Sequence, residues 1–536
     1  MYSSLLPYSN ATKKLTLKQK VAQLFMPAAF INDGEEEILK IEDSIRTNNI
    51  GAICFFHSRA SAATNFEGKK KVVYNDDSYV RLKQLISRYQ KAANVPLLIA
   101  IDAEWGLAMR IEKTPQYPYA ITLGAIQENN DLIFEVGKQI ALDCKKAGVH
   151  WNLAPVVDIN NNPENPVIGY RSFGDDKNMV LAKAEAYLDG MESIGTLGAL
   201  KHFPGHGDTA TDSHLGLPVI NKSKEELTKN ELYPYEKLIK KGVDAVMIGH
   251  LSVPELDDLG NPSTTSSKII TDLLRTDMRF EGVIISDALN MHAVSKKYAQ
   301  KGMLEASAFA AGMDVMCFSE HSKEGIEEIV ASASEKRIEE SFERVWRLKE
   351  RAFLETDMER NINSQSASEL NKKIAHYSIT ELYGSPDTLK EIKANDFLNL
   401  SLGNHSENSF SSKLEGQSGQ PKYQLNAKTI DKIRGKVSEH KNIVLALFPP
   451  SIKPKNKFGI DEVVLDFIQS LISQKNVLIY LFGNPYVIDT LKLKSSSNVV
   501  VVYQDFTEFQ EVAYHHFIGQ TEAKGKLPIT LKTFQV

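Results

Sequence analysis

The chain has 536 residues, of which 42% are hydrophobic and 24% charged, the mixture of a soluble globular protein of roughly two to four domains. This composition excludes a chain that is disordered or fibrous as a whole. The 63 basic and 68 acidic residues leave a formal net charge of −5, so we expect no nucleic-acid partner.

The start of the chain, MYSSLLPYSNATKK, has no basic region followed by an apolar stretch, as a secretory leader would have. No apolar run approaches the roughly 18–20 residues of a membrane span. We therefore expect a cytoplasmic protein as the chain stands, and a periplasmic or secreted one if a leader has been trimmed. The three cysteines, Cys54, Cys144 and Cys317, are too few for a disulfide framework and are expected as buried free thiols.

Short apolar runs alternate with amphipathic helical stretches through the first part of the chain. The runs are almost wholly apolar, which is typical of parallel strands buried on both faces. The expected strands are Gly51–Phe56, Leu97–Asp102, Val149–Asp158, Thr196–Phe203, Ala245–His250, Gly282–Asp287 and Met313–Ser319, with Val21–Phe25 as an eighth. Eight strand–helix units over about 340 residues predict a TIM-like (β/α)8 barrel enlarged by loops.

The helical stretch Ser332–Leu354 is expected to close this barrel, and polar sequence follows it. Strands alternating with helices then resume, with strands expected at Phe397–Leu402, Asn442–Phe448, Asn476–Phe482 and Asn498–Tyr503. The stretch Asn404–Tyr423 is expected as a loop because it is rich in Ser, Gly and Asn. The sequence thus predicts a catalytic barrel over residues 1–355, a linker over 356–390 and a smaller α/β sandwich with a doubly wound sheet over 391–536.

Several of the expected barrel strands end in ionisable residues. These are Asp102, Asp158, Lys201 with His202, His250 and Asp287. One such residue alone is easily explained as a loop or capping residue. Five strands ending this way point to a pocket, because active sites of such barrels lie at the carboxyl ends of the strands.

The densest polar segment is KHFPGHGDTATDSH, residues 201–214, in which Pro204 and two glycines exclude regular structure. A metal site could be built here from His202, His206, Asp208, Asp212 and His214. The spacing matches no helical HExxH or CxxC pattern, so we favour acid/base chemistry without a metal ion or other cofactor. Asp212 and His214 stand two residues apart and can form an Asp–His pair, in which the carboxylate orients the imidazole and stabilises its charged form. His206, between two glycines, is expected to organise the loop.

The segment 201–214 resembles the signature of glycoside hydrolase family 3, in particular its bacterial β-N-acetylglucosaminidase branch. Two more segments are similar to motifs of that family: APVVDINNNPENPVIGYRSFG (Ala154–Gly174), and the run that ends in GVIISDALNM. GKLPITL (Gly525–Leu531) resembles the end of the family's sandwich domain. The resemblance therefore extends over most of the chain.

This resemblance implies a role for each matching residue. Asp287 matches the nucleophile, His214 the general acid/base and Asp212 its partner. The residues that would hold the sugar are Asp102, Arg110, Arg171, Lys201 and His202. Glu104 would contact the substrate or support Arg110, whereas His250 would line the pocket without a role that the sequence assigns.

The implied function is a retaining exo-β-N-acetylglucosaminidase (β-N-acetylhexosaminidase) that acts on chitooligosaccharides or peptidoglycan fragments, so the partner is a small carbohydrate. At the strand end that carries Asp102, the branch usually has DxEGGRxxR, whereas this chain has DAEWGLAMR, with Trp105 and Leu107 replacing Gly and Arg. A β-glucosidase-like exo-glycosidase is therefore an alternative on the same fold. An N-acetylglucosaminide phosphorylase is another, because a neutral imidazole, unlike a carboxylate, does not repel an incoming phosphate. A metal-dependent hydrolase that uses the histidine-rich segment 201–214, called the histidine loop below, is the alternative from another class of enzyme.

Overall fold

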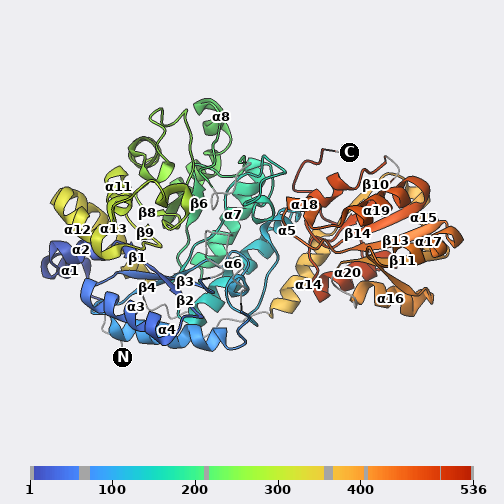
Figure 1. The fold of residues 1–536 in the computed structure, drawn as a ribbon, viewed down its shortest axis with the longest axis horizontal. Helices are drawn as coiled ribbons and strands as arrows, with labels where there is room; N and C mark the ends of the chain where they lie inside the picture. Colours follow the sequence, from blue (N-terminus) through green and yellow to red (C-terminus); the bar gives the residue numbers. More distant parts are fainter. Residues whose placement is uncertain are drawn as a thin grey trace. The chain divides into compact units, whose positions relative to one another are not determined.

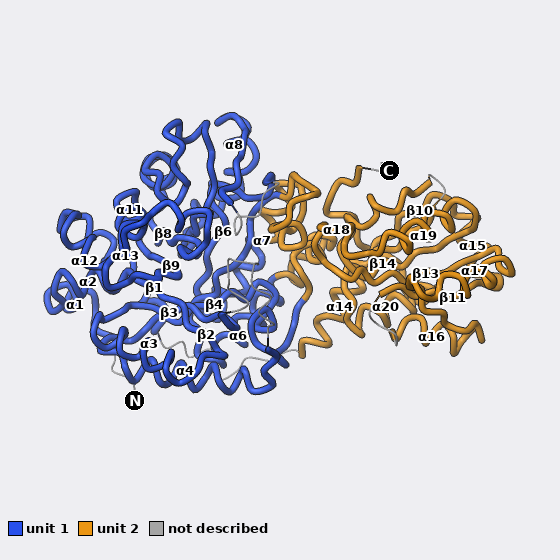
Figure 2. The backbone as a smooth tube through the Cα atoms, viewed as in Figure 1, with its two compact units in different colours: residues 1–117, 134–159, 184–364 blue, residues 118–133, 160–183, 365–536 orange. Residues whose placement is uncertain are grey.

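The computed structural model describes residues 5–59, 73–209, 216–354, 366–403, 408–494 and 497–532. The chain divides into two compact units (Figure 2). The first comprises residues 1–117, 134–159 and 184–364, and the second comprises residues 118–133, 160–183 and 365–536. The sequence-based boundaries run along the chain without interruption, whereas two segments inside the expected barrel, 118–133 and 160–183, pack with the second unit.

The first unit contains short parallel strands joined by helices (Figure 1). Its strands are β1 (Phe25–Met26), β2 (Ala28–Phe30), β3 (Ala52–Phe56), β4 (Leu98–Ile101), β5 (Trp151–Asn152), β6 (Leu200–Phe203), β7 (Ala245–Ile248), β8 (Val283–Ser286) and β9 (Met316–Cys317). Its helices are α1 (Tyr8–Lys14), α2 (Leu17–Ala22), α3 (Glu35–Asn48), α4 (Ser78–Ala92), η1 (Leu107–Met109), α8 (Lys224–Lys229), α9 (Tyr233–Lys241), η3 (Ser263–Thr265), the π-helix η4 (Lys268–Asp277), α10 (His292–Ser295), α11 (Met303–Ala311), α12 (Ser322–Ser332) and α13 (Glu335–Ala352). Two further helices, α6 (Asn130–Ala147) and α7 (Lys177–Glu192), have residues in both units.

All strand pairs of this unit are parallel, in the orders β2-β3-β4-β5, β6-β7-β8 and β1-β9. Isolated parallel bridges join Trp151 to Leu197, Val156 to Lys201 and Ile285 to Val315. The α/β class with parallel sheets is thus confirmed. Every residue of β4, β7 and β8 is buried, as expected for apolar strands covered on both faces.

The apolar run Val21–Phe25 was expected as a strand, and this expectation is wrong. Helix α2 extends through Val21 and Ala22, a turn follows, and the strand β1 begins only at Phe25. The reason is local: Thr16 and Gln19 form a capping box, in which each side chain accepts a hydrogen bond from the other residue's backbone N–H. The expected strand over 149–158 is also shorter than predicted, since β5 contains only Trp151 and Asn152.

The second unit is built on a six-stranded sheet in the order β10-β15-β14-β13-β11-β12, with only β10 antiparallel. The strands are β10 (Thr380–Tyr383), β11 (Phe397–Leu402), β12 (Lys422–Leu425), β13 (Asn442–Leu447), β14 (Asn476–Leu481) and β15 (Asn498–Val501). Its helices are α5 (Ala120–Gly124), η2 (Gly169–Arg171), α14 (Ala367–Ser378), α15 (Pro386–Ala394), α16 (Ser409–Ser418), α17 (Ile430–Glu439), α18 (Lys455–Phe458), α19 (Glu462–Gln474), η6 (Pro485–Thr490) and α20 (Thr507–Phe517).

Helices cover both faces of this sheet (Figure 1). On one face, Leu400 and Leu445 share a buried apolar cluster with Ile433 of α17 and Ile468 of α19. On the other face, Tyr480 contacts the ring of Phe410 from α16, with 4.5 Å between ring centroids, and its hydroxyl lies 2.9 Å from His516 Nδ1 of α20. Among the described residues of both units, no helix is both long and apolar enough to cross a bilayer.

Two segments of the second unit differ from the sequence-based expectation. The segment 356–390, expected as a linker, contains α14, β10 and the start of α15. The loop expected over 404–423 contains α16 and the first residues of β12. Capping side chains explain the helices, because Ser366 forms a capping box with Glu369 and Asn408 accepts a hydrogen bond from the Ser411 N–H.

Candidate functional site

Lys201 joins the ends of two strands in the first unit. Its side chain is only 2% exposed, and its Nζ lies 2.9 Å from Asp102 Oδ1 and 2.8 Å from Glu104 Oε1. Arg110 donates from its Nη2 to the other carboxylate oxygen of Asp102, at 2.8 Å. The sequence analysis predicted that these residues meet, and the structure brings Asp102, Arg110 and Lys201 into direct contact.

The charges around Asp102 decide its protonation state. Burial disfavours the ionised form and would raise the pKa of this carboxyl, but the charges of Lys201 and Arg110 outweigh burial and hold its pKa well below its usual range. Asp102 is therefore an anion at neutral pH. Its side chain is 14% exposed, so it can still accept hydrogen bonds from a ligand.

Asp158 organises the start of the histidine loop. Its carboxylate lies 2.7 Å from His202 Nδ1 and accepts backbone N–H bonds from His202 and from His206, the latter at 2.7 Å. Burial would raise the pKa of Asp158, but the neighbouring His202 lowers it below its ordinary value. Because a carboxylate at Nδ1 holds the proton on that nitrogen, Nε2 of His202 can face a ligand in a fixed orientation.

His206 has the structural role that the sequence predicted for it. Its ring is buried, and Nδ1 lies 2.8 Å from Thr209 Oγ1. Burial and the neighbouring His202 lower the pKa of His206 to about 4, so it is neutral at pH 7. Gly205, beside it, has φ of 128°, and a Cβ there would lie 2.9 Å from a side-chain atom of Glu231, which explains a glycine at this position.

Asp287 follows β8 directly, and its backbone and side chain are both held in place. Its N–H donates to the Ile248 carbonyl, and its Oδ1 accepts from the Ala288 N–H at 2.7 Å. Burial would raise the pKa of Asp287, but His250, His202 and the Ala288 N–H lower it below its ordinary value. The carboxylate is therefore ionised at neutral pH, the state that a nucleophile requires.

His250 supports the backbone next to Asp287, a role that the sequence did not assign. Its Nε2 lies 2.9 Å from the Ala288 carbonyl oxygen, which can only accept, so Nε2 carries a proton and donates. Its Nδ1 lies 2.5 Å from the hydroxyl of Thr264, a fully buried residue of η3. No local signal could have paired positions 250 and 264, because their contact depends on how the loop after β7 folds back.

The residues expected to perform acid/base chemistry, Asp212 and His214, lie outside the described residues. Lys222, which follows them in the chain, forms an ion pair with Asp208, which precedes them. Its Nζ lies 3.1 Å from Asp208 and 2.6 Å from the buried carboxylate of Glu231. Arg171 belongs to the second unit, where it ends η2 and donates to the Val167 carbonyl. The sugar-binding role of Arg171 therefore stays a prediction.

The described part of the first unit thus carries three ionised carboxylates, Asp102 after β4, Asp158 after β5 and Asp287 after β8, and the buried Lys201 in β6. Such a set can bind the hydroxyl groups of a polar ligand through Asp102 and Lys201. It can also present a nucleophilic carboxylate, Asp287, to an electrophilic carbon. No group of three or more metal-binding side chains occurs among the residues that the structure describes.

Residues 16–348 match the family model "Glycosyl hydrolase family 3 N terminal domain". The chain belongs to glycosyl hydrolase family 3. This confirms the resemblance seen in the histidine motif, and every candidate site residue lies inside the matched family 3 segment.

Relatives of this family 3 chain include two bacterial proteins. The β-hexosaminidase A of Pseudoalteromonas piscicida is 35% identical over 243 residues, which span 42% of this chain but only 40% of that protein. The β-hexosaminidase of Tolumonas auensis is 36% identical over 250 residues, spanning 45% of this chain and 72% of that protein.

Two solved structures resemble the family 3 chain over almost its whole length. A glycoside hydrolase family 3 β-N-acetylglucosaminidase from Paenibacillus sp. has a TM-score of 0.76 at 25% identity, covering 97% of this chain and 100% of its own. A β-glucoside phosphorylase has a TM-score of 0.80 at 20% identity, covering 98% and 95%, which shows a shared fold.

Proposed function

We propose that this family 3 chain is a retaining, exo-acting β-N-acetylglucosaminidase (β-N-acetylhexosaminidase). It removes the terminal non-reducing N-acetylglucosamine from chitooligosaccharides or peptidoglycan fragments. The observation that carries this proposal is the set of charges around Lys201: Lys201 and Arg110 bind Asp102, and the charges of His250, His202 and Lys201 counteract burial and keep Asp287 ionised. The bacterial relatives named β-hexosaminidase, at 35–36% identity, support the same activity.

In this proposal the terminal sugar is held by Asp102, Lys201 and His202. Asp102 accepts hydrogen bonds from sugar hydroxyls, and the ammonium of Lys201 donates while keeping the carboxylate ionised. His202, oriented by Asp158 at 2.7 Å, presents Nε2 to the sugar. Arg110 fixes Asp102, and Arg171 is proposed as a further sugar contact.

The reaction proceeds in two displacements. In the first, Asp287 attacks the anomeric carbon, the bond from this carbon to the leaving oxygen breaks, and the imidazolium of His214 gives that oxygen its proton. In the second, a water molecule attacks the same carbon, gives a proton to His214 and releases Asp287. Asp212 accepts a hydrogen bond from His214 throughout and stabilises its charged form.

The first unit is proposed to be a (β/α)8 barrel. The sheets β9-β1, β2-β3-β4-β5 and β6-β7-β8 can join into one ring through the continuous chain from β1 to β2 and the isolated bridges near β5 and β8. Such a ring would bring Asp102, Lys201, His202 and Asp287 to the same end, where the active sites of these barrels lie.

A panel of aryl glycosides tests this function. The wild-type enzyme should release nitrophenol from the β-N-acetylglucosaminide far faster than from the β-glucoside, and Asp287→Asn should abolish release while leaving the circular dichroism spectrum unchanged. A preference for the glucoside would instead make the chain a β-glucosidase-like exo-glycosidase. Near-normal kcat in Asp287→Asn would remove the nucleophile assignment.

A further inference from the structure

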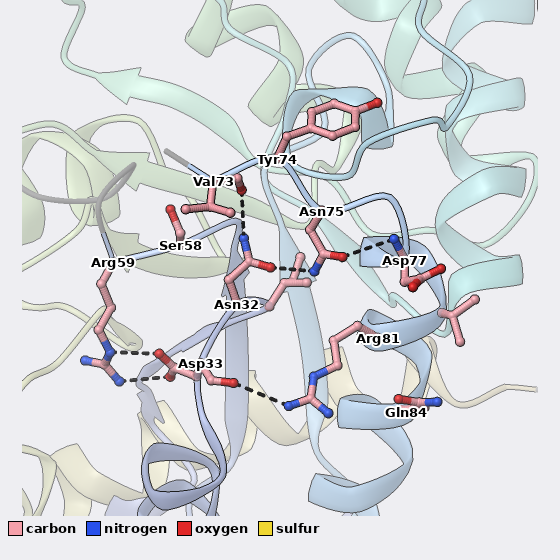
Figure 3. Close-up of a pocket in the computed structure, with 12 residues that line it drawn as sticks. Asn32, Asp33, Ser58, Arg59, Val73, Tyr74, Asn75, Asp77, Arg81 and Gln84 are labelled. Carbon is pink, nitrogen blue, oxygen red and sulfur yellow. Dashed lines mark hydrogen bonds and ion pairs between the residues drawn. The ribbon is translucent and has the colours of Figure 1, made fainter. Parts of the chain in front are cut away.

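A cavity of about 1060 Å³ lies at the carboxyl ends of β2 and β3 (Figure 3). Three short segments line it, from residues 31–33, 58–59 and 73–84, so it is built by two strand ends, the loop before α4 and the first turns of that helix. Its volume is at the upper end of the range for small-molecule sites. Of the proposed catalytic and sugar-binding residues that the structure describes, none lines it.

The wall of this cavity is held by hydrogen bonds and an ion pair between its own residues. Arg59 forms a two-pronged ion pair with Asp33, at 2.8 and 2.9 Å, and Arg81 donates to the Asp33 backbone carbonyl at 3.3 Å (Figure 3). Asn75 donates its amide to the Asn32 side chain at 2.6 Å. A wall fixed in this way needs little reorganisation to bind a ligand.

The surface of the cavity combines apolar and uncharged polar groups. Val73, Tyr74 and Val80 are 69%, 66% and 53% exposed, which is unusual for such side chains on one small patch. Among the described residues, the Tyr74 hydroxyl and the Gln84 amide have no hydrogen-bond partner from the protein. Among the lining residues that the structure describes, two arginines and two aspartates balance in formal charge. An aromatic ring, amide groups and balanced charges suit an uncharged, hydroxyl-rich ligand such as a neutral sugar.

A chain of contacts through one short loop links the wall of the cavity to Asp102. The Asn75 N–H donates to Glu112 Oε1 at 3.0 Å, and the same oxygen lies 2.5 Å from His57 Nε2. Glu112 is two residues from Arg110, which binds Asp102, and two residues of extended chain span at most about 7 Å. The cavity wall therefore lies within reach of an oligosaccharide whose terminal sugar is held by Asp102.

We propose that this cavity is a subsite for a neutral sugar on the leaving-group side of the substrate. The inference rests on the proposed exo-acting function, because an enzyme that holds the terminal sugar leaves only the leaving-group portion to occupy a neighbouring cavity. Tyr74 stacks on the sugar ring, and Gln84 and Arg81 donate to its hydroxyl groups. Longer chitooligosaccharides therefore bind through both sites, whereas an aryl glycoside occupies only the Asp102 site.

The test compares kcat/KM for the chitin disaccharide, trisaccharide and tetrasaccharide with that for nitrophenyl β-N-acetylglucosaminide. In the wild type, kcat/KM should rise with chain length. Tyr74→Ala should remove about fivefold of the value for the longest substrate and leave the aryl glycoside unchanged. Gln84→Ala should shift the same substrates in the same direction. Leu259→Ala, which truncates a 75% exposed side chain that does not line the cavity, is the matched control.

Two results would overturn the subsite: a wild-type kcat/KM independent of chain length, or an equal loss in Tyr74→Ala on the oligosaccharides and on the aryl glycoside. Failure of the proposed function looks different, because then the wild type does not turn over the aryl glycoside at all. In that case calorimetric titration with the tetrasaccharide tests whether the cavity binds a sugar. Weaker binding to Tyr74→Ala than to the wild type supports the subsite, and equal binding shows that the cavity is not a sugar subsite.

Discussion

Lys201 is the residue on which the geometry of the site depends most. Its ammonium is buried and lies within 3 Å of two carboxylates, so neither carboxylate can change its position independently of the other. An ammonium buried in this way is tolerated only because these anions compensate for its lost hydration. The same pairing keeps Asp102 ionised and ready to accept hydrogen bonds from a sugar.

If Asp212 and His214 form the proposed acid/base pair, the activity that a variant loses should depend on the leaving group of the substrate. General acid/base catalysis typically contributes about 10²–10⁴-fold, so His214→Ala should lose about that much on a substrate with a poor leaving group. It should lose less on a nitrophenyl substrate, whose leaving group needs little protonation. Asp212→Asn should follow the same pattern more mildly. Steady-state kcat/KM on chitobiose and on the aryl glycoside gives both comparisons.

Azide provides the control for this prediction. As an anion, azide can attack the glycosyl-enzyme without help from a general base, so it should partly restore turnover in His214→Ala. Equal losses on good and poor leaving groups, together with no effect of azide, would make His214 a structural or binding residue.

The lowered pKa of His206 makes the stability of the protein depend on pH. Its pKa falls from about 6.5 when unfolded to about 4 when folded, so between these values the unfolded state binds more protons. Stability should therefore fall as the pH drops from 6.5 towards 4, by about 3 kcal/mol from this residue. His206→Gln should show a smaller loss of Tm between pH 6.5 and 4.5 than the wild type, measured by calorimetry.

His321→Gln, at the start of α12, is the matched control, since it removes a histidine outside the loop. If His206→Gln and the wild type lose the same Tm over this pH interval, buried neutral His206 does not cause the acid sensitivity.

At the scale of secondary structure elements, the strand ends determine where the chemistry lies. The hydrogen bonds from His250 to the Ala288 carbonyl and from the Ala288 N–H to Asp287 connect the end of β7 to the proposed nucleophile after β8. His250 does not touch the proposed reacting atoms in this arrangement. We propose that it is a positioning residue, which fixes the backbone next to Asp287.

Replacing His250 by phenylalanine keeps a ring but removes the donor to Ala288. Since small misplacements of reacting groups can cost on the order of 10²-fold, His250→Phe should lower kcat by about that factor with little change in KM. His250→Gln, whose amide can donate to the same carbonyl, should recover most of the loss. A merely structural role would instead change Tm equally in both variants and would show no recovery of kcat in the glutamine variant.

Part of the fold and of the candidate site could be predicted from the sequence. The apolar runs located the strands β3, β4, β6, β7 and β8, and the ionisable residues at the ends of the last four of these runs indicated the candidate site. The run 21–25 misled, because the capping box at Thr16 favours a helix before β1. The double pairing of Lys201 and the His250–Thr264 contact could not be predicted, because both depend on loops and strands that meet only in the folded chain.

At the scale of the whole molecule, the family 3 segment contains every proposed catalytic residue, and none of the proposed steps uses a metal ion. His202 and His206 are already engaged by Asp158 and Thr209. Activity on the aryl glycoside should therefore be unchanged after prolonged dialysis against EDTA. Loss of activity in chelator that zinc restores would favour the metal-dependent hydrolase.

Asp287 is proposed to form a covalent bond to the sugar during turnover. The direct measurement is mass spectrometry of peptides from enzyme quenched while it turns over a fluorinated N-acetylglucosaminide whose glycosyl-enzyme hydrolyses slowly. The peptide containing Asp287 should gain the mass of one fluorinated N-acetylglucosaminyl residue, and the same peptide of Asp287→Asn should gain none. An unlabelled Asp287 peptide during active turnover, or a label on a different residue, would show that Asp287 is not the nucleophile.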